Sequence, residues 1–457
     1  MAVPSDDALF ARLRRLRREP PPDAEDAQAD APGEAGASEP AEADVPIWLR
    51  RRMQARRRLG FAEEVDPTPS APVSLEPPAR LREERTDAGD YALRLDERGR
   101  DAEHGAVRLD EVAAVAPDAY RRFARDGGLD AIDLGRAVYL DIETTGLSGG
   151  AGTYPFLVAL GRFTDGGFEV WQGFLRSPDE EPAMLHAAAE RIGAASAIVS
   201  FFGKSFDRHR LEDKMRLHGV EPPFEGRPHL DLYHPCARLY RDGFPDGRLC
   251  TMERELCGVR REDDLPGAYA PAAWFDFLAG RPHRLEAVFR HNLDDVLSLV
   301  TLAAHLGRVA EETSADGQAL PGPAGLRALG LARLAADRGE RDEALLWIER
   351  AIQRLDGPLR GPRTLRADLR RLTGDHERAR GDYEALAEEA VDEHAVHALL
   401  QLAKDAEHRR RDLPAAAALC ARARVLLEEG CTGRGYARHR RDLEKRAERL
   451  RTKLDRS

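Results

Sequence analysis

Hydrophobic residues between positions 137 and 306 fall into short runs separated by polar turns and amphipathic stretches. The runs that predict β-strands lie at residues 137–142, 156–163, 168–174, 197–202 and 230–232. The stretches that predict helices lie at residues 177–192, 205–218 and 285–306, and a capping box at Ser177 opens the first of them. The first three strands follow one another closely enough to form an antiparallel meander. This order predicts an α/β fold, a mixed sheet flanked by helices, over residues 135–310.

The pattern changes after residue 320, where Ala, Leu, Arg and Glu recur with a helical period. Three segments, 339–344, 374–379 and 410–415, each separate two predicted helices and end in an alanine, and these alanines are 35 and 36 residues apart. Tetratricopeptide repeats have a period of about 34 residues. We therefore predict an all-α, tetratricopeptide-like domain over residues 321–455, with an irregular helical bundle as the alternative.

The first 80 residues have a different composition. Residues 20–45 contain no Lys or Arg and consist mainly of acids, Ala, Pro and Gly, which cannot bury enough apolar surface to fold. Six arginines follow between Arg50 and Arg58. We predict a mostly disordered arm over residues 1–80, whose arginines either bind nucleic acid or a partner or form a solvated charged face. Residues 81–134 are expected to connect this arm to the sheet.

Length and charge restrict the class of protein. The 457 residues suffice for two or three domains, and Lys+Arg 70 against Asp+Glu 81 gives a net charge of −11. Part of the acidic excess lies in residues 20–45, so the net charge does not exclude a polyanionic substrate. The longest apolar stretch, 296–306, is shorter than the ~20 residues of a membrane-spanning helix, and no secretory signal is evident. We expect a cytoplasmic protein without membrane contact.

Four acidic residues carry the candidate chemistry. Asp141 and Glu143 are two residues apart on the first predicted strand, so both side chains face the same side of the sheet. Asp207 follows the fourth strand, and Asp295 lies on the last predicted helix, one turn after His291. Carboxylate oxygens are preferred ligands of Mg²⁺ and Mn²⁺, and a bound ion would relieve the repulsion between the acids. The pattern favours a metal site over acids that merely face solvent at the end of a strand.

Six motifs surround these acids, and together they resemble a known family. They are Asp141–Leu147, Gly203–Asp207, Asp231–Pro235, Asp264–Gly267, Trp274–Phe275 and His291–Leu299. The set resembles the YprB-type ribonuclease H-like family, within the DEDD (DnaQ-like) 3′→5′ exonuclease superfamily. The sequence departs from the exonuclease pattern at two positions: Phe202 replaces the usual Asn of the second motif, and His291 stands in the register of a catalytic Tyr.

The resemblance implies phosphodiester hydrolysis with two Mg²⁺ or Mn²⁺ ions, held by Asp141, Glu143, Asp207 and Asp295. His291 would orient or deprotonate the attacking water. The residues that would contact the substrate are Thr144, Gly146, Leu147, Lys204, Ser205 and Asn292. The implied substrate is DNA or RNA, and the C-terminal helical domain would be available to a protein partner.

Two other functions remain open from the sequence. The chain could be a catalytically weak nucleic-acid-binding or adaptor protein that relies on its helical domain, although the presence of all four acids argues against this. It could also be a ribonuclease H-like endonuclease, although the helical position of Asp295, with His291 one turn before it, favours an exonuclease. A small-molecule enzyme is disfavoured because no dinucleotide-binding or P-loop motif is present.

Overall fold

The computed structural model describes residues 80–124, 127–146, 152–262, 264–282, 284–313, 320–428 and 434–455. The arm predicted over residues 1–80 lies outside the described residues, except for Arg80. No helix in these described ranges is both long and apolar enough to cross a membrane.

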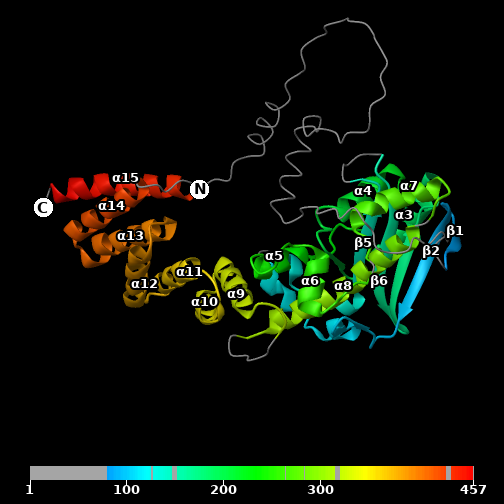
Figure 1. The fold of residues 1–457 in the computed structure, drawn as a ribbon, viewed down its shortest axis with the longest axis horizontal. Coiled ribbons are helices and arrows are strands. Elements are labelled where there is room, and N and C mark those ends of the chain that lie inside the picture. Colours follow the sequence, from blue (N-terminus) through cyan, green and yellow to red (C-terminus); the bar gives the residue numbers. More distant parts are fainter. Residues whose placement is uncertain are drawn as a thin grey trace, which may run out of the picture. The chain divides into compact units, whose positions relative to one another are not determined.

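A seven-stranded mixed sheet forms the centre of the fold between residues 82 and 311 (Figure 1). Its strands are β1 (Arg82–Thr86), β2 (Gly89–Arg98), β5 (Val138–Thr144), β6 (Pro155–Thr164), β7 (Gly167–Phe174), β8 (Ile198–Ser200) and β9 (His229–Asp231), in the order β1-β2-β7-β6-β5-β8-β9. Strands β5, β6 and β7 form the predicted antiparallel meander, whereas β8 and β9 continue the sheet in parallel with β5. A separate short pair, β3 (Glu103–His104) and β4 (Val107–Arg108), lies outside this sheet.

Strands β1 and β2 extend the sheet beyond the five strands predicted. They fall in residues 81–134, for which the sequence predicted only a connecting role. Strand β2 pairs with β7 over seven registered positions, and its charged residues concealed the strand pattern in the sequence. The segment therefore contributes to the central sheet rather than merely leading to it.

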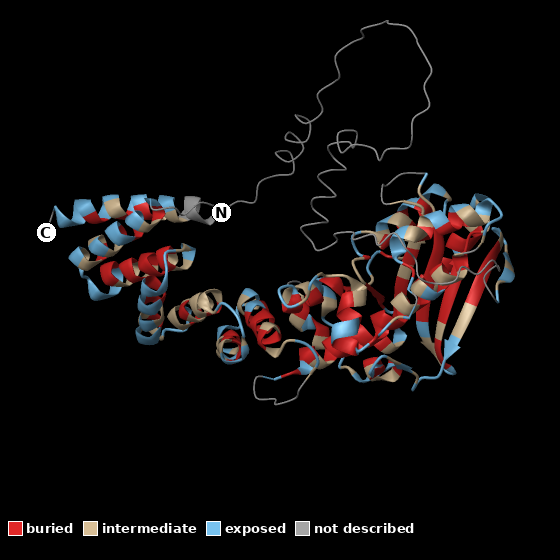
Figure 2. Cartoon of the chain, viewed as in Figure 1, coloured by how far each residue is buried: buried red, intermediate tan, exposed pale blue. Residues whose placement is uncertain are grey.

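Helices cover both faces of the sheet. They are α3 (Glu181–Gly193), α4 (Asp207–Leu217), α5 (Tyr233–Tyr240), α6 (Leu249–Cys257), α7 (Ala270–Leu278) and α8 (Leu285–Glu311). Alternation along β5 separates two cores: Val138 and Leu140 pack with α3 and α4, whereas Tyr139 packs on the face that α8 covers. Figure 2 shows buried residues concentrated between the sheet and these helices.

Two local features differ from, or add to, the sequence prediction. Ser177 makes no capping hydrogen bond, and Glu180 accepts instead from the backbone N–H of Arg176, so a 3₁₀ turn (Pro178–Glu180) precedes α3. Helix α8 lies close to β6 at Gly161, where an added Cβ would come within 2.6 Å of Val296. This close approach brings α8, with its polar residues, against the strands of the sheet.

The described residues after 320 are helical: α9 (Ala324–Arg338), α10 (Arg341–Arg354), α11 (Arg360–Leu372), α12 (His376–Glu389), α13 (Glu393–Asp405), a π-turn (Ala406–Arg410), α14 (Leu413–Glu428) and α15 (Arg434–Leu454). Successive helices pack against one another. The predicted turns coincide with real ones, and Gly339 and Gly374 end α9 and α11 with φ of +82° and +92°. A helical C-terminal region is thus confirmed, and its tetratricopeptide character stays a prediction.

Candidate active site

Strand β5 presents Asp141 and Glu143 to helix α8. Both residues share the parity of Tyr139, which packs on the α8 face of the sheet, and both are half-buried. A register shift between Glu143 and Thr144 ends the regular pairing of β5 with β6 just beyond the two acids. The acids therefore lie at the end of a buried strand, beneath a helix that carries further polar groups.

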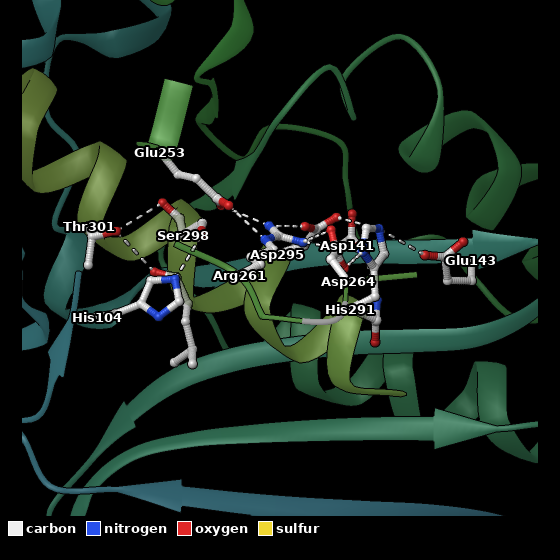
Figure 3. A network of polar contacts seen from close by, with 12 residues as sticks. His104, Asp141, Glu143, Glu253, Arg261, Asp264, His291, Asp295, Ser298 and Thr301 are labelled. Atoms are coloured by element: carbon white, nitrogen blue, oxygen red, sulfur yellow. Dashed lines mark hydrogen bonds and ion pairs between the residues drawn. The ribbon is translucent and has the colours of Figure 1, made fainter. Parts of the chain in front are cut away.

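Helix α8 supplies His291 and Asp295 to the same place (Figure 3), and Asn292 of the same helix contacts Asp141. The Nε2 atom of His291 lies 3.7 Å from Oδ2 of Asp295 and 4.0 Å from Oε1 of Glu143. Its Nδ1 atom lies 2.7 Å from Oδ1 of Asp264, which belongs to the loop between α6 and α7. The predicted pairing of His291 with Asp295 on one helical face is thus present, and Asp264 orients the imidazole from its other side.

Asp207 reaches the cluster from the start of α4. It is buried, and burial, followed by the charges of Asp231, Glu143 and Asp295, raises the pKa of its carboxyl group. The turn before it is fixed by Asp231 of β9, which accepts hydrogen bonds from the backbone N–H groups of Phe202 (2.7 Å) and Lys204 (3.1 Å). Gly203 is required in this turn, because a Cβ there would come within 2.7 Å of Oδ2 of Asp207.

The cluster concentrates negative charge in a poorly solvated place. Burial, and then the charges of Asp295 and Asp207, raise the pKa of Asp141 well above its usual value. Burial also raises the pKa values of Glu143 and Asp207, and neighbouring acids add to both shifts. Burial alone would lower the pKa of His291, but Asp295, Asp264 and Glu143 raise it to about 10. In the metal-free cluster these acids therefore favour the protonated form of the imidazole.

Arg261 is the cation nearest to these acids. Its guanidinium donates to both carboxylate oxygens of Glu253 on α6, at 2.6 and 2.7 Å, and to Oδ1 of Asp295 at 2.5 Å. Asp264 lies 3.6 Å away and the Nδ1 atom of His291 3.2 Å away. Only 6% of the Arg261 side chain is exposed.

Two buried side-chain amides, those of Asn292 and Gln172, form a hydrogen-bonded chain that holds Asp141. Asn292, which is fully buried, donates to Oδ2 of Asp141 at 2.6 Å and accepts from Gln172 at 2.9 Å. Gln172 of β7 also accepts from Arg94 of β2 at 3.1 Å. The sequence suggested that Asn292 contacts the substrate. Its location favours a different role, which is to position Asp141.

The other residues predicted to contact substrate are distributed around the cluster. Lys204 and Ser205 are exposed beside Asp207. Thr144 is buried and donates to the carbonyl oxygen of Gly146 at 3.0 Å, which shapes the chain leaving β5. Leu147 lies outside the described residues.

The donor set suits a hard divalent cation. It consists of four carboxylates, from β5, α4 and α8, whose mutual repulsion a cation would relieve. As the side chains stand, no group of three His, Cys, Asp or Glu residues in the described ranges has the geometry of a formed metal site. The four residues therefore fit the ion by the chemistry of their oxygen donors.

The fold places acids on the inner strand β5 and on α8, the helix that covers it, and the family match assigns this part of the chain to a nuclease-type class of domain. Residues 138–307 match the RNase H superfamily, so the chain carries a domain of that superfamily. Over 277 residues the chain is 30% identical to "Uncharacterized protein YprB" of Bacillus subtilis (strain 168). The match covers 60% of this chain and 65% of the length of that relative. The predicted resemblance to YprB-type, ribonuclease H-like proteins is confirmed, whereas its DEDD exonuclease part stays a prediction.

Several residues of the site were not predicted from the sequence. Arg261 stands in the charged run 260–264, Glu253 lies on a helix that was not predicted, and Gln172 and Arg94 lie on strands β7 and β2. Asp231 and Asp264 belong to the motifs that carry the resemblance, and that membership was the available signal. Arg261 offered only its place three residues before Asp264.

Proposed function

We propose that the protein is a metal-dependent nuclease that hydrolyses phosphodiester bonds of DNA or RNA, as a 3′→5′ exonuclease. The observation that carries the proposal is that Glu143 and Asp295 lie 4.0 and 3.7 Å from His291, in a cluster where burial and neighbouring acids also raise the pKa values of Asp141 and Asp207. Buried acids are rarely left unpaired, so this excess of negative charge indicates a site for external cations. The RNase H superfamily domain over residues 138–307 supports the same assignment.

Each residue has a role that its surroundings support. The four acids would hold two Mg²⁺ or Mn²⁺ ions, which when bound activate the attacking water and stabilise the leaving 3′-oxygen. His291, oriented by Asp264, would position that water. Asn292 holds Oδ2 of Asp141 and so fixes the direction of the carboxylate. Lys204, exposed beside Asp207, would contact a substrate phosphate.

The placement of the last acid supports an exonuclease over an endonuclease. Asp295 lies on α8 one turn after His291, and their side chains are 3.7 Å apart. This is the arrangement that the family resemblance associates with exonucleases. We assign to the helices after residue 320 the role of a scaffold for a protein partner or for the substrate.

The test uses full-length protein with Mn²⁺ or Mg²⁺ on DNA and RNA labelled at either end, in single- and double-stranded forms. A covalently closed single-stranded circle is included because an exonuclease cannot cut it. We compare Asp141→Asn and Asp295→Asn with the exposed control Asp213→Asn on α4. We expect mononucleotide release from 3′ ends, intact circles, and about 100-fold or greater loss in the two site variants only, because metal assistance is worth several kcal/mol.

Cleavage of the circle would replace the exonuclease by an endonuclease. Equal activity in the wild type and both site variants, or no cleavage of any substrate, would refute the nuclease assignment.

A further inference from the structure

Arg261 occupies one oxygen of Asp295, a carboxylate that we propose as a metal ligand. The guanidinium is 2.5 Å from Oδ1 of Asp295, and it carries its charge at all accessible pH values. One oxygen of this carboxylate is thus already paired with a cation, and only Oδ2 remains, 3.7 Å from His291. An ion that binds Asp295 must approach a fixed positive charge or displace it.

Arg261 is also anchored so that it does not readily leave. Two parallel hydrogen bonds, of 2.6 and 2.7 Å, join it to Glu253, whose side chain is 1% exposed. Glu253 lies on α6, which packs against α8, the helix that carries Asp295. Moving the guanidinium away would leave a buried carboxylate without a counter-charge, which is costly.

The opposite side of the cluster has no comparable cation. Asp141 is held by the neutral amide of Asn292. In the part of the chain that the structure describes, neither Asp141 nor Asp207 forms an ion pair with a lysine or an arginine. A divalent ion that binds at Asp141 therefore displaces no guanidinium or ammonium group from that carboxylate; the nearest imidazole, that of His291, lies 4.0 Å from Glu143.

We propose that Arg261 is a built-in competitor of the divalent cation at Asp295, which makes the two ion positions of the site unequal. The substrate-free protein holds one ion firmly at Asp141 and a second only weakly at Asp295. The negative charge of a bound phosphodiester then favours entry of the second ion. This inference rests on the proposed function, and it assigns to Arg261 the control of when the site becomes complete.

The test is a titration of the metal-free, full-length protein with Mn²⁺. Binding is measured by calorimetry and by the electron paramagnetic resonance signal of free Mn²⁺. We expect two classes of site in the wild type, with affinities that differ about tenfold or more. Arg261→Gln should tighten the weaker site about tenfold, whereas Arg261→Lys, which keeps the charge, should change it little. Arg176→Gln, whose arginine pairs with Glu83 and Glu180 outside the cluster, is the matched control.

Glu253→Gln gives a second test that does not depend on removal of the arginine. It leaves the positive charge of Arg261 uncompensated, so the weaker Mn²⁺ site should weaken further. A merely structural role for the pair predicts weaker binding in both Arg261→Gln and Glu253→Gln, and that result would overturn the inference. Two equal sites in the wild type, unchanged in Arg261→Gln, would also overturn it. If Mn²⁺ does not bind at all, the proposed function itself fails together with the inference.

Discussion

Among the described residues, two of the buried charge clusters have opposite composition, one around Glu407 in the helical region and one around Arg261 in the nuclease-type domain. In the first, Glu407 accepts hydrogen bonds from Arg446 at 2.5 Å, Arg449 at 2.7 and 2.9 Å, and Lys453 at 2.9 Å. In the second, Arg261 is shared among Glu253, Asp295 and Asp264. One cluster has a single acid among cations, and the other has a single arginine among acids.

This difference separates a structural cluster from a functional one. The carboxylate of Glu407 is fully paired, and it joins the π-turn after α13 to α15. Around Arg261 the acids outnumber the cations, and Asp141, Glu143 and Asp207 add further negative charge. A cluster that is compensated internally stabilises the fold, whereas one left with excess charge is prepared for an external ion.

The largest effect is expected from Glu407→Gln. The substitution leaves the buried guanidinium of Arg446, 7% exposed, with only the more distant Asp442 at 3.9 Å, so the free energy of unfolding of the helical region should fall by about 3 kcal/mol. Glu428→Gln is the control, since its pair with Arg424 is 3.8 Å long and exposed and should be worth less than about 0.5 kcal/mol. Urea denaturation followed by circular dichroism measures both. Equal losses in the two variants would contradict the structural role of the cluster.

The two clusters should respond to pH with opposite signs. The pKa values of Asp141 and Asp207 are raised in the folded state above the unfolded value of about 3.9, so their contribution to stability is greatest at low pH and is lost as pH rises. Burial by itself would raise the pKa of Glu407, but Arg449 and Lys453 lower it to about 2. Its contribution is present above the unfolded value of about 4.3 and is lost as pH falls toward 2.

Thermal melts of the metal-free protein between pH 5 and 8 test this contrast. The transition of the nuclease-type domain should move to lower temperature as pH rises, by a few degrees, and that of the helical region should not move. Asp141→Asn should flatten the first trend, and Mn²⁺ should abolish it. If the melting temperature of the metal-free wild-type domain rises with pH, the excess of negative charge around Asp141 and Asp207 is contradicted.

A smaller effect is expected from Gln172→Leu, which breaks the support beneath Asp141. The substitution removes the amide that donates to Asn292 and accepts from Arg94. Asn292, which holds Asp141, then loses its own support, so the direction of the Asp141 carboxylate is no longer fixed. We expect a loss of roughly 10- to 100-fold in Mn²⁺ affinity or activity, together with about 1–3 kcal/mol of stability. Gln401→Leu, in the helical region, is the control and should leave activity unchanged. A stability loss without a change in Mn²⁺ affinity would show that the amides serve only packing.

The smallest effect is expected from Lys204→Ala, because this side chain is exposed at the rim of the acidic cluster. KM for a nucleic-acid substrate should rise a few-fold with kcat nearly unchanged, and the salt dependence of binding should weaken by about one ion. Lys445→Ala on α15, also exposed, is the control. An unchanged salt dependence in Lys204→Ala would remove Lys204 from the substrate contacts.

The sequence by itself determined the order of the core elements and the four acids. Strands β5, β6 and β7 could be predicted because their apolar runs are uninterrupted, and α8 because its apolar residues recur with a helical period. The period of two along β5 places Asp141 and Glu143 on one face of the sheet. These features are local, since each depends on residues a few positions apart.

Only the tertiary structure decided what surrounds those acids. Arg94 and Gln172 face each other across β2 and β7, and Gln172 meets Asn292 across 120 residues of chain. Glu253 and Arg261 meet Asp295 because α6 packs on α8. No periodicity in the sequence encodes such contacts, because they depend on how closely separate elements pack. The acids could therefore be identified in the sequence. The fold alone decided which charges compensate them and where that compensation is incomplete.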